Sequence, residues 1–336
     1  MRLPADTVAR LRTFYEGRSV CVTGGAGFIG GHMIDVLMAV GATVSVIDDL
    51  SNSTLEHLAG LIELEPDRLH FFHASILDAS ALQQAFASCQ TVFHLAAVGS
   101  VSKSVADPVR SWTVNATGTL RVLEAARAAR VERVIAASSS SIYGDQPVLP
   151  NVESMLPRPM SPYAVTKLTG EHLLSVWAQN YGLSTASLRY FNVFGPRQSA
   201  DSQYGAAIAI FAKRLLNSQP ARIFGDGKQS RDMTFVSNAV VATLLAGACP
   251  TRLTGQAFNI GTGRAVTVLD IAAAVAREAG APQQDPVFEP ARPGEVRHSL
   301  ADITEARKVL GYEPIATFEE GIKETVAWFR HAYAGT

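Results

Sequence analysis

A tyrosine and a lysine stand four residues apart in the segment 161–167, Ser-Pro-Tyr-Ala-Val-Thr-Lys. Side chains at this spacing lie on one face of a helix, so the ammonium of Lys167 can sit beside the phenol of Tyr163. A fixed cation favours the phenolate, and lowering the phenol pKa by about three units takes roughly 4 kcal/mol. Such a group exchanges a proton with a hydroxyl near neutral pH. The alternative is an ordinary solvated helix face.

A glycine-rich segment near the N-terminus indicates a dinucleotide site. The apolar run 19–23 leads directly into Gly-Gly-Ala-Gly-Phe-Ile-Gly at 24–30, and a helical pattern of apolar residues follows. In the dinucleotide fingerprint Gly24 permits a tight turn, Gly27 lets the backbone approach a diphosphate, and Gly30 lets the helix pack on the strand. The diphosphate is expected at the N-terminus of that helix.

An acidic residue follows the second apolar run, 43–47, at Asp48. It lies at about the 20-residue distance from the glycine loop that the fingerprint requires. A carboxylate here can accept both adenosine ribose hydroxyls and repels a 2′-phosphate, which favours NAD over NADP. Asp49 remains an alternative for this role, although Asp48 directly ends the apolar run.

Further apolar runs alternate with helical patterns, which predicts a doubly wound parallel Rossmann sheet of the α/β class. They are residues 69–72, 91–95, 134–137 and 185–189. We assign residues 1–189 to the NAD-binding domain and expect the chain to return to it near 234–260. Residues 190–336 are expected to form mainly a smaller, mixed α/β substrate lobe, because Pro and Gly interrupt the pattern more often there. Ligands bind at the carboxyl ends of such strands.

Composition excludes several other classes. The 336 residues are 47% hydrophobic and 18% charged, so a large core is available, and 29 basic against 30 acidic residues argue against a nucleic-acid partner. Three dispersed cysteines indicate neither a disulfide framework nor a metal site, and we expect a reducing cytoplasm. The first seventeen residues contain no continuous apolar run, so we expect no membrane segment.

Two arginine-bearing loops in the second half could bind phosphate. Arg231 precedes Asp232, and the segment Arg-Pro-Gly-Glu spans residues 292–295. A pair of guanidinium groups can clamp a diphosphate through its fixed fork of donors. The alternative is a pair of surface ion pairs.

Residues 19 to about 308 resemble an NAD-dependent nucleotide-sugar epimerase of the extended short-chain dehydrogenase/reductase superfamily. The resemblance rests on four motifs, which match in order and spacing: the glycine loop 24–30, the serine run 138–141 before Ile-Tyr-Gly, Tyr163 with Lys167, and Arg-Tyr-Phe-Asn at 189–192. The branch is the one acting on UDP-hexoses and UDP-N-acetylhexosamines at C4.

The resemblance implies that Ser139, Tyr163 and Lys167 are catalytic. In related 4,6-dehydratases an aspartate and a glutamate stand where this chain has Ser140 and Ser141, so dehydration is disfavoured. Apart from Tyr163 and Lys167, the cofactor-binding residues that the resemblance implies are Gly24, Gly27, Phe28, Ile29, Gly30, Asp48, Asn52, Ser53, Ser75, Ile76, Leu95, Ala96, Ala97 and Asn115. Ser75 replaces the usual adenine-binding aspartate and is expected to bind more weakly. No metal is expected.

The residues that the resemblance assigns to the UDP-sugar are Gly99, Ser100, Ser139, Ser140, Ser141, Asn192, Phe224, Arg231, Arg292, Glu295 and Ser299. Galactose-type epimerases carry a tyrosine where this chain has Ser299, and the small side chain leaves volume for a 2-acetamido group. Gly99, where several epimerases carry a lysine, resembles the same branch. Ser299 could instead simply fill a loop. Uronate epimerases typically carry threonine at position 192 and arginine at position 199, unlike this chain.

We therefore expect reversible C4 epimerisation, with UDP-N-acetylglucosamine and UDP-N-acetylgalactosamine as the expected pair, through a transient 4-keto sugar with bound NAD. The alternatives are UDP-glucose/UDP-galactose epimerisation, UDP-uronate epimerisation or decarboxylation, and a non-catalytic NAD-binding regulator. Relatives pair two long helices across a dimer, and the matching segments here, 108–129 and 163–181, predict a homodimer with a four-helix contact.

Overall fold

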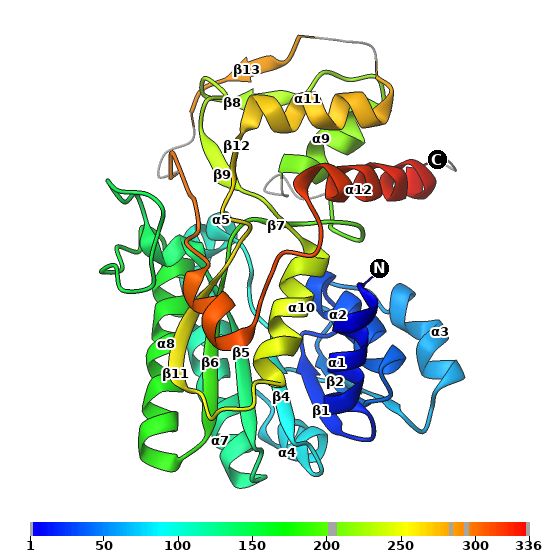
Figure 1. The fold of residues 1–336 in the computed structure, drawn as a ribbon, viewed down its shortest axis with the longest axis vertical. Coiled ribbons are helices and arrows are strands. Elements are labelled where there is room, and N and C mark those ends of the chain that lie inside the picture. The colour runs from blue at the N-terminus through cyan, green and yellow to red at the C-terminus, as the bar shows by residue number, and fades with distance from the viewer. Residues whose placement is uncertain (1–2, 201–206, 282–284, 292–295, 334–336) are drawn as a thin grey trace.

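A parallel sheet of seven strands forms the centre of the molecule (Figure 1). The computed structural model describes residues 3–200, 207–281, 285–291 and 296–333. The strand order is β11-β6-β5-β4-β1-β2-β3. The strands are β1 (Ser19–Thr23), β2 (Thr43–Asp48), β3 (Leu69–His73), β4 (Thr91–His94), β5 (Arg133–Ser139), β6 (Ser184–Tyr190) and β11 (Thr254–Ile260). This architecture confirms the predicted Rossmann-like α/β fold.

Apolar side chains on both faces of the sheet explain why helices cover it on both sides. Along β1, Val20 and Val22 face one core cluster, whereas Cys21 faces the other, as the two-residue period of a strand requires. The first cluster packs beneath α1 (Ala5–Tyr15), α2 (Phe28–Ala39) and α10 (Val236–Gly247). The second packs beneath α4 (Ala79–Phe86), α7 (Gly118–Ala128) and α8 (Pro162–Tyr181).

Local sequence fixes the ends of α8, the helix that carries Tyr163 and Lys167. The Ser161 hydroxyl accepts a hydrogen bond from the Ala164 amide at 3.2 Å, and Pro162 occupies the first helical turn. Gly182 ends the helix in the left-handed conformation, with φ of 74°. Because Tyr163 and Lys167 lie in the first two turns, this N-cap sets the position of both side chains.

The predicted helix 108–129 is present but not regular throughout. It comprises α6 (Pro108–Trp112), a π-helical turn (Thr113–Thr117) and α7, and the shorter helix α5 (Val101–Ala106) precedes it. The π turn contains Asn115, whose amide side chain bonds the Val98 backbone and the Thr166 hydroxyl. A widened turn at this point lets one side chain join the helix to the loop after β4. Helix α3 (Glu56–Leu64), between β2 and β3, is the remaining helix of the half that contains the large sheet.

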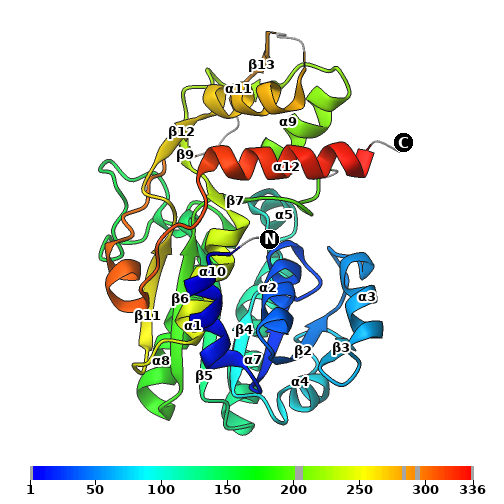
Figure 2. The same ribbon diagram turned by 45° about the vertical axis from the view of Figure 1, so that its right-hand side comes forward.

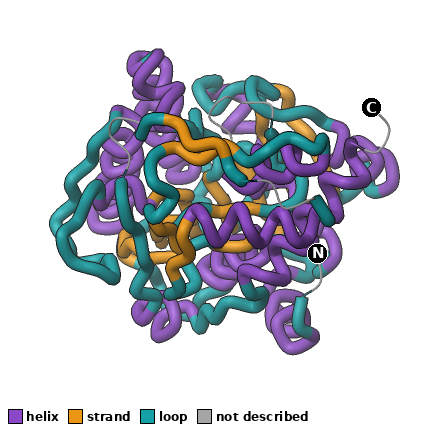
Figure 3. The backbone as a smooth tube through the Cα atoms, turned by 90° about the horizontal axis from the view of Figure 1, so that it is seen from above, coloured by secondary structure: helices purple, strands orange, loops and turns teal. Residues whose placement is uncertain are grey.

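The smaller lobe lies over the carboxyl end of the sheet (Figure 2), and Figure 3 views it from above. Its helices α9 (Ala207–Leu216), α11 (Val268–Ala279) and α12 (Phe318–Tyr333) pack together. Its short strands are β7 (Val193–Phe194), β8 (Arg222–Phe224), β9 (Ser230–Asp232), β10 (Thr234–Phe235), β12 (Ala265–Thr267) and β13 (Val287–Glu289). They pair as β10–β7, β12–β9 and β13–β8.

The chain passes between the sheet and this lobe several times. It leaves the sheet after β6, forms β7 to β10, and returns through α10 and β11 before it forms β12, α11 and β13 in the lobe. A second π turn, Ala306–Leu310, then packs against α10 and β11, and α12 completes the lobe. Among the described residues, no helix is both long and apolar enough to cross a membrane.

Candidate active site

The carboxyl ends of the central strands open into a cavity of about 930 Å³, which residues of the smaller lobe line from the other side. Its lining gathers most of the predicted site. The predicted residues that line it are Gly24, Gly27, Phe28, Ile29, Gly30, Asp48, Asn52, Ser53, Ser75, Ile76, Leu95, Ala96, Ala97, Gly99, Ser100, Ser139, Ser140, Ser141, Tyr163, Lys167, Asn192, Arg231 and Ser299.

Two of the predicted residues that the structure describes are not among the lining. Phe224 lies on β8 and Asn115 in the π turn, where its three hydrogen bonds are to protein groups. Asn115 therefore positions the wall of the cavity. Arg292 and Glu295 lie outside the described residues.

The glycine loop brings bare backbone to the cofactor side of the cavity. Gly24 has a φ of 71°, and a Cβ atom on it would lie 2.6 Å from the Ala96 nitrogen. A Cβ atom on Gly30 would collide with the Gly24 carbonyl. Gly27 caps α2 without a side-chain hydrogen bond, which leaves the first amides of the helix available to an anion. This arrangement fits a dinucleotide diphosphate.

Asp48 is buried where β2 ends and holds the loops around it. Its carboxylate accepts hydrogen bonds from the Ala26 amide at 3.0 Å, the Leu50 amide at 2.9 Å and the Ser53 hydroxyl at 3.1 Å. Asp49 is exposed and accepts a bond from the Ser51 amide. Both acids line the cavity, but Asp48 alone of the two is bonded to the glycine loop, so the geometry favours it for the ribose.

The catalytic candidates meet where β5 ends against the first turns of α8. The Lys167 ammonium donates to the Ala137 carbonyl at 2.7 Å and lies 5.9 Å from the centre of the Tyr163 ring. The Ser139 side chain hydrogen-bonds the phenol and also accepts from the Ser141 amide at 3.1 Å. Ser139, Tyr163 and Lys167 therefore form one group on the cavity wall.

The pKa of Tyr163 does not follow the expectation that Lys167 lowers it. Burial raises the pKa of the Tyr163 phenol, and the hydrogen bond from Ser139 opposes this effect only in part. The reason is that the ammonium is directed to the Ala137 carbonyl and a phenolate here loses its water. Burial also lowers the pKa of Lys167 to about 8, against the attraction of Glu171.

A buried ion pair behind the catalytic group was not predicted from the sequence. The Glu171 carboxylate accepts from Arg189 at 2.7 Å and 3.0 Å and from the Ser138 hydroxyl at 2.5 Å. Glu171 lies one helical turn after Lys167, and Arg189 is in register with Ser138 across β5 and β6. The spacing Tyr-x-x-x-Lys-x-x-x-Glu was the available signal.

This network continues toward the substrate side. Arg189 also donates to the Tyr143 hydroxyl at 2.8 Å, which itself donates to the Asn259 side chain at 2.6 Å. The Asn259 amide then bonds the carbonyls of Asn151 and Asp302. A continuous chain of hydrogen bonds thus joins α8 to the segment that follows Ser299.

The substrate side is assembled around Asn192, whose φ of 30° is unusual for a residue with a side chain. Its amide donates to the Asp232 carbonyl at 3.2 Å and to the Ser299 hydroxyl at 3.3 Å. The Arg231 guanidinium bonds the carbonyls of Ser230 and Arg297, each at 2.9 Å. These bonds bring Asn192, Arg231 and Ser299 to one wall of the cavity.

Two polar atoms of the cavity lining indicate where a ligand would be held. The Gln198 carbonyl oxygen and the Ser141 hydroxyl are buried without a hydrogen-bond partner among the described residues. Leaving such an atom unsatisfied costs about 1–3 kcal/mol, so each is suited to a ligand group. Gln198 was missed from the sequence because its loop gave no pattern.

Comparison with known proteins agrees with this geometry. Residues 20–261 match the model of the NAD dependent epimerase/dehydratase family. The chain belongs to that family. A curated relative, the UDP-glucose 4-epimerase of Mycolicibacterium smegmatis, is 42% identical over 92% of this chain and 98% of its own.

Solved structures resemble this epimerase over nearly its whole length. The UDP-glucose 4-epimerase of Thermus thermophilus in complex with NAD is 38% identical, with a TM-score of 0.84 over 94% of this chain and 99% of that one. The UDP-N-acetylglucosamine 4-epimerase of Methanobrevibacter ruminantium is 35% identical, with a TM-score of 0.88 and the same coverage. The predictions of the family, of an enzyme and of NAD as its cofactor are confirmed.

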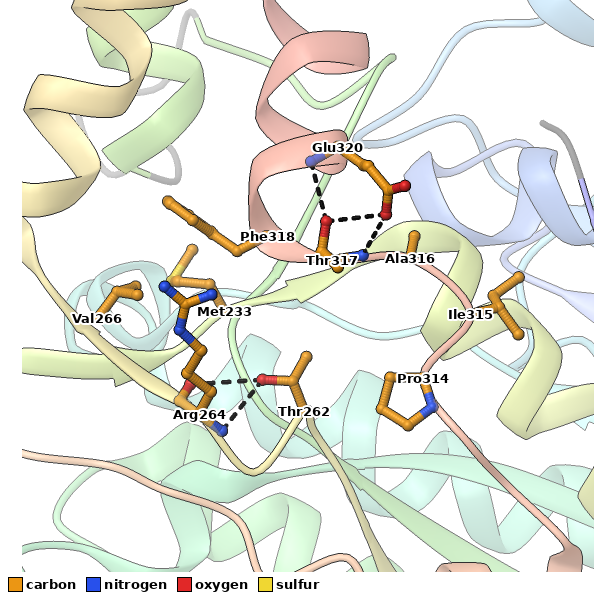
Figure 4. A pocket seen from close by; sticks show the side chains of 10 residues that line it. All are labelled: Met233, Thr262, Arg264, Val266, Pro314, Ile315, Ala316, Thr317, Phe318 and Glu320. Carbon is orange, nitrogen blue, oxygen red and sulfur yellow. Dashed lines mark hydrogen bonds between the residues drawn. The ribbon is translucent and has the colours of Figure 1, made fainter.

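A second, smaller pocket of this epimerase lies outside the active site (Figure 4). Its volume is about 260 Å³, and the start of α12, the loop before β12 and the residues around Met233 form it. Thr317 and Glu320 cap α12 with reciprocal hydrogen bonds, and Arg264 pairs with Glu319 at 3.0 Å. These polar groups bond one another, and the pocket holds none of the predicted catalytic residues.

Proposed function

We propose that this epimerase catalyses the reversible inversion of C4 in a UDP-sugar. The observation that carries the proposal is that Ser139, Tyr163 and Lys167 line the same cavity as the glycine loop and the Asn192 wall. This shared cavity supports a role for the three residues in proton transfer between a bound cofactor and a sugar on the substrate side. The names of the relatives in M. smegmatis and M. ruminantium support this reaction.

In the proposed mechanism the amides of the glycine loop and Asp48 would hold NAD, which would supply the reversible hydride chemistry at the sugar carbon. Tyr163 removes the proton of the 4-hydroxyl and later restores it, while Ser139 hydrogen-bonds the same oxygen. Lys167 carries a positive charge beside the phenol at neutral pH, since its pKa of about 8 leaves it mostly protonated. The sugar turns within the cavity between the two transfers.

The carboxylates of the cavity argue against dehydration. Among the described lining residues they are Asp48 and Asp49, both on the cofactor side. Water elimination from a sugar needs an acid and a base beside the ring, and Ser140 and Ser141 offer only hydroxyls there. Simple inversion needs no such pair.

For the sugar itself we propose the N-acetylated pair, UDP-N-acetylglucosamine and UDP-N-acetylgalactosamine. Ser299 is buried at the cavity wall, and its backbone pairs with Ser230 and Asp232 of β9, so a small side chain stays in that place. A larger side chain here would fill space that an acetamido group needs. The alternative is the glucose/galactose pair, which the name of the M. smegmatis relative supports.

The test is an assay of purified protein and its Tyr163→Phe variant with the two acetylated and the two unacetylated UDP-hexoses. We expect the acetylated pair to turn over fastest, and the variant to lose about a thousandfold in kcat while retaining NAD. Equal rates for the variant would refute the assignment of Tyr163. Equal turnover of all four sugars would refute the role of Ser299, and no turnover with NAD bound would indicate a regulator.

We also propose that the epimerase acts as a cytoplasmic homodimer. Val105 and Val109 are 64% and 74% exposed on the edge that α5 and α6 form beside α8, and Trp112 and Val176 are exposed there too. Burying these apolar side chains against a second copy would give the four-helix contact. Light scattering of native protein and Val109→Asp tests this, with a dimer expected only for the native chain.

The buried free thiols of all three cysteines fit the reducing compartment that we propose, the cytoplasm.

A further inference from the structure

A hydrogen bond joins the two segments that follow β2 and β4, on either side of the glycine loop. In the sheet, β2 and β4 lie on either side of β1, so the segments that follow them flank the glycine loop that follows β1. Asn52 lies in the segment after β2, and Lys103 lies on α5 after β4. The Lys103 ammonium donates to the Asn52 carbonyl oxygen at 2.6 Å, and both residues line the cavity.

The backbone that carries Lys103 is held in place. Its amide donates to the Ser100 hydroxyl at 3.2 Å, which begins α5. The next residue, Ser104, is buried and accepts a hydrogen bond from the Tyr163 amide at 3.0 Å. Helix α5 therefore connects the start of the catalytic helix to the loop beside Asp48.

On the cofactor side of the cavity, the charges of the protein and of a bound diphosphate are mainly negative, so one additional cation would be stabilised there. The end of β2 and the segment after it, residues 48–55, contain two aspartates and no basic residue, and a diphosphate brings two more negative charges. The basic side chains among the described lining residues are Lys103, Arg110, Lys167 and Arg231. The Lys167 ammonium is bonded at the end of β5, and Arg231 is bonded within the smaller lobe. Of these four, Lys103 is the one that is bonded to the segment after β2, through Asn52.

We propose that Lys103 is a further cofactor-binding residue, whose ammonium, held by Asn52 beside the glycine loop, binds the diphosphate of NAD and slows its dissociation. A primary ammonium has three donors, so one can remain on Asn52 while others reach phosphate oxygens. Retention suits this enzyme, because inversion returns NAD to its starting state and no exchange is needed between turnovers.

The experiment measures cofactor exchange and not turnover. Native protein and the variants Lys103→Met, Lys103→Arg, Asn52→Ala and Arg110→Met are loaded with NADH and diluted into excess NAD, and the loss of bound-NADH fluorescence gives the dissociation rate. Lys103 is exposed, so the fold is expected to survive, which thermal melting checks. Arg110→Met is the matched control, since it removes one positive charge from the same cavity without removing the bond to Asn52.

We expect dissociation to become about tenfold faster in Lys103→Met, since a charge-assisted hydrogen bond is lost, and to stay near the native rate in Lys103→Arg. The dissociation rate of Asn52→Ala should lie between the rates of the native protein and of Lys103→Met. Added salt should accelerate exchange in the native protein more than in Lys103→Met. A native rate in Lys103→Met would overturn the proposal. Equal acceleration in Arg110→Met would also overturn it, by showing that only the general positive field matters.

Discussion

The cofactor side of the cavity is built from backbone at the ends of long parallel strands, whereas the substrate side is built from side chains on the three-residue strand β9 and on the loop segments beside β7 and β9. Gly24 directly follows β1 and Gly30 lies in the first turn of α2, so neighbouring elements in the sequence position both glycines. Asn192, Arg231 and Ser299 come from three distant segments, which hydrogen bonds join. A fixed backbone suits a cofactor common to a whole family, and exchangeable side chains suit a variable sugar.

Breaking the buried Glu171–Arg189 ion pair, which links the two sides of the cavity, should have the largest effect on stability. Glu171→Gln removes one charge of the buried pair with Arg189, whose side chains are 8% and 6% exposed, and leaves the guanidinium unpaired. We expect a loss of about 3 kcal/mol in the free energy of unfolding, measured by urea denaturation. Glu124→Gln, which removes an exposed pair with Arg127 on α7, is the control and should change nothing measurable. Equal stability of both variants would contradict the structural role of the pair.

On the cofactor side, Gly30→Ala should cost about 1–3 kcal/mol of stability, because the new Cβ atom has backbone atoms of Gly24 and Gly25 in its way. NAD affinity, measured by titration calorimetry, should fall at least about tenfold as the loop moves. Gly60→Ala on α3 is the matched control, since its Cβ atom meets open space. If the sugar preference changed instead of NAD affinity, the two sides of the cavity would not be separable.

On the substrate side, Ser299→Tyr should change sugar preference without changing NAD retention. We expect kcat/KM for UDP-N-acetylglucosamine to fall about tenfold relative to UDP-glucose, since the ring occupies the space proposed for the acetamido group. Ser299→Thr is the conservative control and should keep the native ratio. An unchanged ratio in the tyrosine variant would mean that another residue selects the sugar.

The smallest expected effect is on pH dependence. Burial lowers the pKa of Lys167 to about 8 from the ordinary 10.5, so the ammonium is present below that pH and is lost as the pH rises through it. If the ammonium is needed, kcat/KM should decline above pH 8, by up to about tenfold for each pH unit. Lys167→Arg stays charged and should show no such decline. A native profile that continues to rise to pH 9 would show that Lys167 need not be protonated.

The sequence predicted what depends on neighbouring residues. The run 19–23, the glycines after it and Asp48 at the next strand end were sufficient for the sheet and for NAD, because β1, the loop and α2 are contiguous. The roles of Asp48, Ser139 and Ser299 remain predictions. The pair Glu171–Arg189 depends on the register of β5 with β6, and the bond from Lys103 to Asn52 joins residues 51 positions apart. The raised pKa of Tyr163 could not be predicted, because it follows from burial and from the direction of one lysine side chain.

The path of the chain through the smaller lobe has a consequence for how the protein is made. The last strand of the large sheet, β11, pairs with β6 although some sixty residues separate them, from Phe191 to Leu253, which include β7 to β10 of the smaller lobe and α10 on the face of the sheet. During synthesis from the N-terminus, β6 is therefore an open edge until residue 260 has left the ribosome. An exposed edge of this kind invites pairing with other chains. Nascent chains that stop before β11 should accordingly be the ones that require a chaperone.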